Sequence, residues 1–289
     1  MNKLQKIAEE TIEAVEAGIY TNPSGKIISL DKMMAYCIHR SKLYKPTDRP
    51  ESDNQRLEYN NCKINISPEI VVTKESSLEA AARLAKENPC LLNFASAKHA
   101  GGGFLRGAPA QEESIARSSG LYHTLIRHQE YYEENKRSQA KNIGLYLNYA
   151  IYSPDVPVFR NDAGDWLEEP YLVSVVTSPA PNRHAILEDE DNKKIFIDDY
   201  EAEEMMEIDI KKTFSIRMKQ VLSIMAAEGH RTIILGAWGC GVFGNDPLVV
   251  AELFRDNLKN VPFFDSVVFA ILDKEDSYTF RSFSQIFSS

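Results

Sequence analysis

The chain has few cysteines and no long apolar run. Only 4 of its 289 residues are cysteines, and they are scattered, with no Cys-x-x-Cys pair and no histidine cluster beside them. This pattern argues against a disulfide framework and a zinc site and favours reduced thiols. No apolar stretch approaches the roughly 20 residues that span a bilayer, and the N-terminus lacks the apolar core of a signal peptide. We therefore expect a cytoplasmic protein with no membrane contact, no metal and no other cofactor.

The chain also lacks an excess of positive charge. Its 33 Lys and Arg residues are outnumbered by 42 Asp and Glu residues, which gives a formal net charge of −9. General DNA- or RNA-binding surfaces are normally basic, so this balance argues against one. It does not exclude a polyanionic ligand held locally by backbone amides and a few arginines.

The N-terminal part reads as an appendage to a larger domain. Apolar residues at helical spacing predict a helix over 3–17, ended by Gly18. A second, short helix is expected over 31–41, within a polar stretch punctuated by proline. We therefore divide the chain into an N-terminal helical extension, residues 1–60, packed on a catalytic domain, residues 61–289.

From about residue 62, short apolar segments alternate with amphipathic ones. Such alternation predicts an α/β protein in which helices cover both faces of a largely parallel or mixed sheet. The acidic stretch 186–204 is expected to be a solvated loop. The expected strands are 70–73, 90–95, 145–151, 156–159, 171–177, 232–235 and 266–272, and the expected helices are 76–86, 114–128, 212–228 and 247–258.

A glycine run followed by acidic residues is the most informative local feature. Gly101, Gly102 and Gly103 follow an expected strand, and Glu112 and Glu113 stand at the start of the next helix. Glycines allow positive φ and close approach of the backbone to a ligand, and successive amides can bind an anion. The adjacent carboxylates are candidates for acid–base chemistry. The alternative is an ordinary acidic first helical turn, which the helix dipole alone favours; the glycines favour the functional interpretation.

A second glycine-rich loop, residues 236–247, also lies between a strand and a helix. Its amides and the helix dipole favour a phosphate group. It is neither a Walker A motif, since no Gly-Lys-Ser/Thr follows, nor a convincing Rossmann fingerprint. One such loop alone would read as a tight turn. Two of them at the carboxyl ends of strands, where α/β proteins bind ligands, indicate a shared site for a diphosphate.

Residues 93–122 and 236–247 resemble the microbial type of poly(ADP-ribose) glycohydrolase, a branch of the macrodomain family. The hallmark of that family is three glycines followed, after a short spacer, by Gln-Glu-Glu; here the spacer is 104–110. Ala100 stands where family members usually have proline. The resemblance covers about residues 60–280. It implies a macrodomain-like three-layer α/β/α sandwich with a mixed sheet, to which the N-terminal helical appendage is added.

The resemblance implies a hydrolase that cleaves ribose–ribose O-glycosidic bonds of poly(ADP-ribose) and releases ADP-ribose. Glu113 would be the catalytic general acid/base, and Glu112 would orient the ribose hydroxyls. By the same resemblance, Asn93 would steady the first loop or reach the ribose, and Gln111 would fix that loop. The distal ribose and diphosphate would be surrounded by Gly101, Gly102 and Gly103. The diphosphate would meet the amides of Gly239, Cys240, Gly241 and Val242, and Phe243 would pack against the distal ribose.

The physical chemistry agrees with one acid and one positioning carboxylate. A carboxylic acid can protonate the leaving oxygen and then, as a carboxylate, activate water. Adjacent helical residues project about 100° apart, so Glu112 and Glu113 cannot face each other like an ordinary glycosidase pair. A helix N-terminus lowers a carboxyl pKa, whereas burial and a neighbouring carboxylate raise it. The sequence leaves that balance open.

Four further side chains have alternative interpretations. Phe280 or Phe283 could stack on adenine, although core packing is the usual role of an aromatic residue. Arg117 could contact a phosphate group or Glu113 within the site. The alternative is an ordinary i,i+4 ion pair between Glu113 and Arg117 on the surface of the helix. Cys240 contributes its amide, unless its position makes the thiol reactive.

Two other functions remain open at this point. The chain could be a hydrolase acting on mono-ADP-ribosylated proteins, or an ADP-ribose-binding module without turnover. The intact Gln111-Glu112-Glu113 argues against a pure binding module. The expected partners are poly(ADP-ribose) or an ADP-ribosylated protein, with ADP-ribose as the product.

Overall fold

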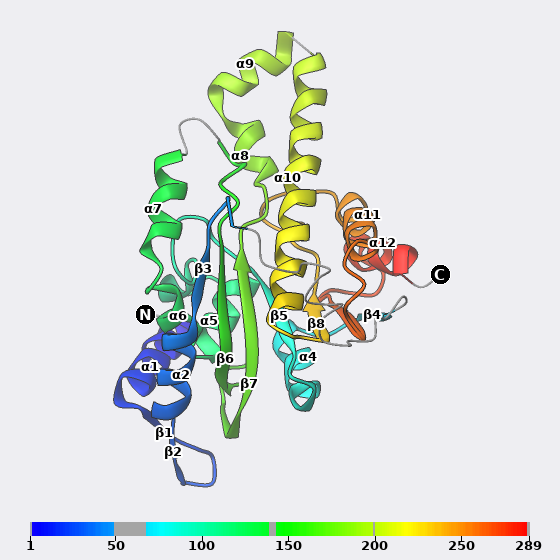
Figure 1. The fold of residues 1–289 in the computed structure, drawn as a ribbon. Coiled ribbons are helices and arrows are strands. Elements are labelled where there is room, and N and C mark those ends of the chain that lie inside the picture. Colours follow the sequence, from blue (N-terminus) through cyan, green and yellow to red (C-terminus); the bar gives the residue numbers. More distant parts are fainter. Residues whose placement is uncertain (1, 49–67, 139–142, 199, 288–289) are drawn as a thin grey trace.

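A computed structural model describes residues 2–48, 68–138, 143–198 and 200–287, and a seven-stranded mixed sheet runs through it (Figure 1). The strand order is β3-β6-β7-β5-β8-β9-β4. The neighbours from β7 through β4 are parallel, and only the β3–β6 and β6–β7 pairs are antiparallel. The strands are β3 (Lys42–Tyr44), β4 (Glu69–Thr73), β5 (Cys90–Phe94), β6 (Ala150–Arg160), β7 (Trp166–Ser178), β8 (Thr232–Leu235) and β9 (Ser266–Ala270).

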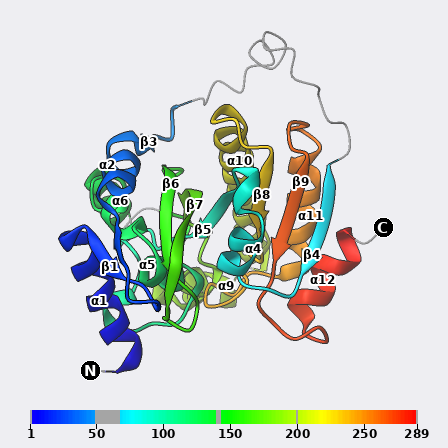
Figure 2. The ribbon, with the colours of Figure 1, turned by 90° about the horizontal axis from the view of Figure 1, so that it is seen from below.

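Helices cover both faces of the sheet (Figure 2). Because side chains alternate along a strand, Cys90 and Leu92 enter one core and Leu91 enters the other. The first core is closed by α10 (Tyr200–Ala227), α11 (Pro247–Leu258) and α12 (Tyr278–Phe287). The second is closed by α4 (Ser77–Arg83), α5 (Gln111–Ser118), α6 (Leu121–Leu125) and α7 (Gln129–Ser138). The expected three-layer architecture is confirmed.

The N-terminal region combines two helices with three short strands. α1 (Lys3–Ala17) has the expected bounds, since Asn2 and Gln5 form a capping box and Gly18 closes the helix with φ 71°. A hairpin of β1 (Ile19–Thr21) and β2 (Ile27–Ser29) precedes α2 (Asp31–Arg40), and β3 then pairs with β6. Neither the hairpin nor β3 was expected. The proposed boundary at 60/61 lies outside the described residues and stays a prediction.

Three expected segments in the middle of the chain have different limits. Of the strand expected over 145–151, residues 145–149 are not in a strand, and residues 150–151 join the expected strand 156–159 in one strand, β6. β6 has a register shift beside Asp155, whose φ is 45°. The single helix expected over 114–128 is divided into α5 and α6. The division falls at Ser119, which has extended backbone and forms a bridge with Val158 of β6.

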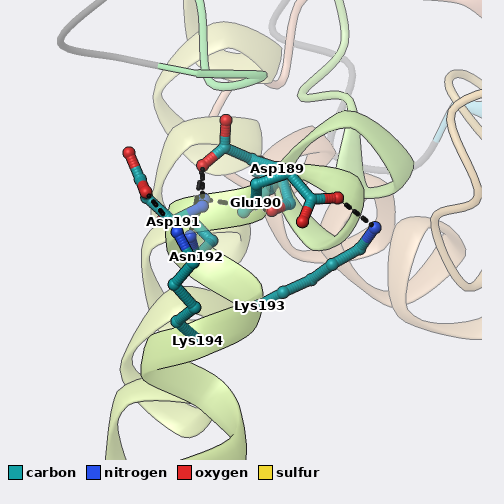
Figure 3. Close-up of polar contacts among 7 residues, drawn as sticks. Asp189, Glu190, Asp191, Asn192, Lys193 and Lys194 are labelled. Carbon is teal, nitrogen blue, oxygen red and sulfur yellow. Dashed lines mark hydrogen bonds and ion pairs between the residues drawn. The ribbon is translucent and has the colours of Figure 1, made fainter.

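Apart from Asp189, the described residues of the acidic stretch 186–204 are helical, so the prediction of a solvated loop was wrong. The stretch contains the end of α8 (Arg183–Glu188), α9 (Glu190–Asp198) and the start of the 28-residue α10. The side chain of Asp189 accepts hydrogen bonds from the backbone N–H groups of Asp191 and Asn192 at 3.2 and 3.1 Å (Figure 3). Ion pairs at i,i+3 spacing then link Glu190 to Lys193 and Asp191 to Lys194 along α9 (Figure 3). Capping and these pairs stabilise a polar helix.

Short 3₁₀ turns complete the structure: η1 (Ala85–Glu87) follows α4, and η2 (Phe104–Arg106) follows the first glycine loop and contacts α1 and α5. No helix in the described parts of the chain has the length and apolarity needed to cross a membrane.

Candidate active site

A cleft of about 810 Å³ lies at the carboxyl ends of β5, β8 and β9. Its walls come from the first glycine loop, the N-terminal turn of α5, residues 237–243 of the second glycine loop, and residues 270–273 after β9. The two loops that the sequence singled out therefore line one cavity. A smaller hollow of about 590 Å³ between β4, β9 and α4 contains none of the predicted site residues.

The two glutamates differ in their surroundings. Glu113 Oε1 accepts a hydrogen bond from the backbone N–H of Gly103 at 2.8 Å. Glu112 is only 3% exposed; its Oε2 accepts from the backbone N–H of Ser96 at 2.7 Å, and its Oε1 accepts from Asn93 Nδ2 at 3.3 Å. Burial raises the pKa of Glu112 to about 8, against the lowering effect of the hydrogen bond from Ser96, and the charge of Glu113 raises it further. The sequence left open whether the pKa of this carboxyl group is raised or lowered, and for Glu112 burial makes the net effect a raised pKa.

Gly102 lies directly against both carboxyl groups. Its φ is 58°, in the left-handed region that glycine tolerates. A Cβ on Gly102 would overlap Glu113 Oε1 and come within 3.0 Å of Glu112 Oε2. The glycine therefore allows the loop backbone to reach the pair of acids.

Gln111 and Asn93 support the acids from behind. Gln111 Oε1 accepts from the backbone N–H of Phe94 at 2.8 Å, and its Nε2 donates to the Leu92 carbonyl at 2.9 Å, which ties the start of α5 to the end of β5. Asn93 is fully buried, and its Nδ2 also donates to Thr177 Oγ1 at 3.2 Å. Neither Asn93 nor Gly101 lines the cleft. Of the two roles expected for Asn93, its position suits support of the loop.

The second loop brings Gly239, Cys240, Gly241, Val242 and Phe243 to the cleft wall. Gly239 has φ 76°, and a Cβ there would approach Ala180 Cβ to 2.6 Å. Asn245 holds the loop, since its Nδ2 donates to the carbonyls of Gly239 at 2.9 Å and Pro181 at 2.8 Å. The ring of Phe243 faces that of Tyr146, with centroids 6.3 Å apart.

Burial narrows the choice for three of the side chains with alternative interpretations, and two of them, Arg117 and Cys240, line the cleft. Arg117 is 6% exposed and donates from Nη1 to the Ala108 carbonyl, so it is not a surface pair with Glu113. Burial raises the pKa of the Cys240 thiol, which argues against a reactive thiolate. Phe283 is fully buried against Phe269 at 5.3 Å between ring centroids, so adenine stacking by Phe283 was a wrong expectation.

The remaining candidate for adenine stacking, Phe280, packs against the same core and does not line the cleft. It lies on α12, a helix that the sequence analysis did not predict. The cleft is instead lined there by Thr279 of that helix and by Leu272 and Asp273 after β9.

Sequence reasoning missed several residues of the site. Ser96 holds Glu112 through its backbone, which no side-chain pattern reveals. Asp162 accepts from Ser114 Oγ at 2.9 Å and Ser76 Oγ at 2.5 Å at the cleft wall. Tyr146 lines the cleft with φ 58°, unusual for a residue other than glycine. Among the described residues, no group of three or more His, Cys, Asp or Glu side chains is arranged to hold a metal.

Taken together, the geometry suits acid–base cleavage of a bond in an anionic ligand. One carboxyl group is deeply buried and held by two donors, and its neighbour is reached by a backbone amide of the glycine loop. Loop amides beside a helix N-terminus bind diphosphate well.

Comparisons with known proteins agree with this chemistry. The family model described as microbial-type PARG, catalytic domain, matches residues 8–161. The structure of poly(ADP-ribose) glycohydrolase from Thermomonospora curvata is 41% identical, with a TM-score of 0.82, and the match covers 98% of this chain and 99% of that one. The same enzyme bound to the inhibitor ADP-HPD is 40% identical, with a TM-score of 0.78 and 98% of each chain covered.

A more distant structure, poly(ADP-ribose) glycohydrolase from Deinococcus radiodurans in complex with ADP-ribose, is 33% identical, with a TM-score of 0.71, and the match covers 88% of this chain and 96% of that one. No curated protein matches the chain. The family model spans more than half of the chain, and the Thermomonospora structure matches nearly all of it. The chain therefore belongs to the family of microbial-type PARG catalytic domains.

Proposed function

We propose that this protein is a poly(ADP-ribose) glycohydrolase that cleaves ribose–ribose O-glycosidic bonds and releases ADP-ribose. The observation that carries the proposal is the meeting of Glu112 and Glu113 at Gly102, in a cleft shared with the second glycine loop. Related structures with ADP-ribose and with the inhibitor ADP-HPD support the substrate class. The fold is that of a macrodomain-type enzyme in this proposal.

In the mechanism, Glu113 acts as the general acid and base. Its carboxyl proton goes to the oxygen of the leaving ribose as the glycosidic bond breaks and an oxocarbenium-like centre develops. The resulting carboxylate then takes a proton from water as that water attacks the same carbon, which regenerates the acid. The hydrogen bond from Gly103 holds Glu113 in place for both steps.

Glu112 positions the substrate. With a pKa raised to about 8 by burial, it carries a proton at neutral pH. The hydrogen bonds from Asn93 and Ser96 hold its two oxygens in place, and its proton would be donated to a ribose hydroxyl. Gly239, Cys240, Gly241 and Val242 would offer amides to the diphosphate, and Phe243 would pack against the distal ribose.

The proposed location is the cytoplasm, where glutathione and thioredoxin keep thiols reduced. Cys37, Cys90 and Cys240 are free thiols in the structure. Detection of the native protein in a cytosolic fraction would support this part of the proposal.

The test measures release of ADP-ribose by the wild type, Glu113→Gln and Glu112→Gln. The substrates are poly(ADP-ribose) and proteins mono-ADP-ribosylated on serine, glutamate or arginine. Glu133→Gln is the matched control, because Glu133 is exposed on α7 and does not line the cleft. We expect the wild type and control to release ADP-ribose from the polymer and Glu113→Gln to be inactive while still binding ADP-ribose.

Other results would change the conclusion. Turnover of a mono-modified protein alone would make the chain a mono-ADP-ribosyl-protein hydrolase. ADP-ribose binding with no release from any substrate would make it a binding module. Full activity of Glu113→Gln would refute the assigned mechanism.

A further inference from the structure

A fully buried arginine lies behind the cleft wall. Arg217, from the middle of α10, has no exposed surface, and none of the described carboxylates forms an ion pair with it. Burying a guanidinium without a counter-ion is costly unless its donors are satisfied. Four of its five N–H donors are used: Nε bonds Asn148 Oδ1 at 2.9 Å, Nη1 bonds the Pro179 carbonyl at 2.9 Å, and Nη2 bonds the carbonyls of Leu145 and Tyr146.

These acceptors belong to two segments that are distant in sequence. Residues 145–148 precede β6, and Pro179 follows β7; the two strands are antiparallel neighbours, with Ile151 paired to Thr177. The start of one strand and the end of the other therefore meet at the cleft. Arg217 joins them through a single planar group.

Both segments supply a residue to the cleft wall. Tyr146 lines the cleft opposite Phe243. Its φ is 58°, and its carbonyl accepts a hydrogen bond from Arg217 Nη2 at 2.9 Å. Strained backbone of this kind persists only where the surroundings hold it. Ala180, next to Pro179, also lines the cleft and packs against Gly239.

We propose that Arg217 is a positioning residue that fixes Tyr146 and Ala180 as the wall facing the second glycine loop, and thereby sets the affinity for ADP-ribose. The inference rests on the proposed function for the identity of the ligand. The hydrogen-bond partners of Arg217 are backbone carbonyls and the Asn148 side chain, and neither Glu112 nor Glu113 is among them. Its loss should therefore raise KM and Kd more than it lowers kcat.

The test compares Arg217→Lys with Arg160→Lys. Arg160 is the matched control, because it is also buried, at 2% exposed, but does not line the cleft. It donates a hydrogen bond to Glu10 at 2.8 Å and lies over the Trp166 ring. Lysine keeps the charge but cannot bond two segments with a planar fork. We expect both variants to lower Tm, but only Arg217→Lys to raise the Kd for ADP-ribose and the KM for polymer, by roughly 10- to 100-fold.

Tyr146→Gly tests the same wall with Arg217 intact, should Arg217→Lys fail to fold. Glycine accepts the positive φ and removes the ring together with its hydroxyl, which accepts a hydrogen bond from Asn182 Nδ2 at 3.5 Å, so Kd should rise without a comparable fall in Tm. Equal Kd values for Arg217→Lys and Arg160→Lys, or an unchanged Kd in Tyr146→Gly, would overturn the inference. A wild type that binds ADP-ribose but does not hydrolyse polymer would refute the proposed function alone, whereas one that does not bind ADP-ribose would refute both.

Discussion

The buried carboxyl group of Glu112 makes the stability of the protein depend on pH. Its pKa is raised from 4.5 to about 8, chiefly by burial, so the folded state binds this proton more tightly than the unfolded chain. A raised pKa in the folded state stabilises the protein, and this contribution to the free energy of unfolding is fully present below pH 4.5 and is lost as pH rises through 8. Over that pH window the free energy of unfolding falls by about 1.4 kcal/mol per pH unit, and the total loss reaches on the order of 5 kcal/mol.

Glu112→Gln removes this titration with little change in shape. The amide cannot ionise, and its oxygen can still accept the hydrogen bond from Ser96. Its NH₂ group would face Asn93, whose Oδ1 is buried without a partner among the described residues. A rotated Asn93 amide can therefore accept from the new side chain, so the variant should not leave an additional buried polar group unpaired.

The measurement is urea unfolding of the wild type and of Glu112→Gln between pH 5 and pH 9. We expect the variant to gain stability relative to the wild type as pH rises and the difference to level off above about pH 8. Equal m-values would show that the unfolded states are comparable. Parallel pH curves for the two proteins would refute the argument that burial of Glu112 governs its protonation.

Three further predictions concern the cleft and its supporting core. Gly102→Ala should reduce turnover about 100-fold by displacing both carboxyl groups, whereas Gly229→Ala, also at positive φ but with no atom within 4 Å, should change only stability; equal kinetic losses would contradict this. Cys240 should react slowly with a thiol reagent at pH 8 in the native protein, because burial raises its pKa; fast labelling of that residue would be the opposing result. Phe283→Ala should cost about 3–5 kcal/mol in urea unfolding yet leave ADP-ribose affinity unchanged, and weakened binding at full stability would restore a stacking role.

The sequence predicted elements whose signals are local. The capping box at Asn2 and the glycine at the end of α1 mark both ends of that helix, and Pro247 marks the first residue of α11. The glycine loops could be placed at the carboxyl ends of strands because the strand–loop–helix order is written in the chain. The acidic helix α9 also had a local signal, the cap at Asp189, which the density of charge obscured.

Features that depend on distant partners could not be predicted. β3 has only three residues and exists because β6, more than 100 residues later, pairs with it. The pKa of Glu112 depends on burial, which is a property of the assembled cleft. The positive φ of Tyr146 has no sequence signature, since its carbonyl is held by Arg217, 71 residues further along the chain.

The pairing of β3 with β6 has a consequence for shortened forms of the protein. β6 is an 11-residue strand, buried along nearly all of its length and covered at its outer side by β3 and α2. A chain beginning at residue 68 would lack β3 and would leave the N–H and C=O groups of residues 150–152 of β6 without their antiparallel partner. Such an edge is a template for strands of other molecules. We therefore expect that truncation to self-associate through its sheet, and we expect β3 to limit such association in the full chain.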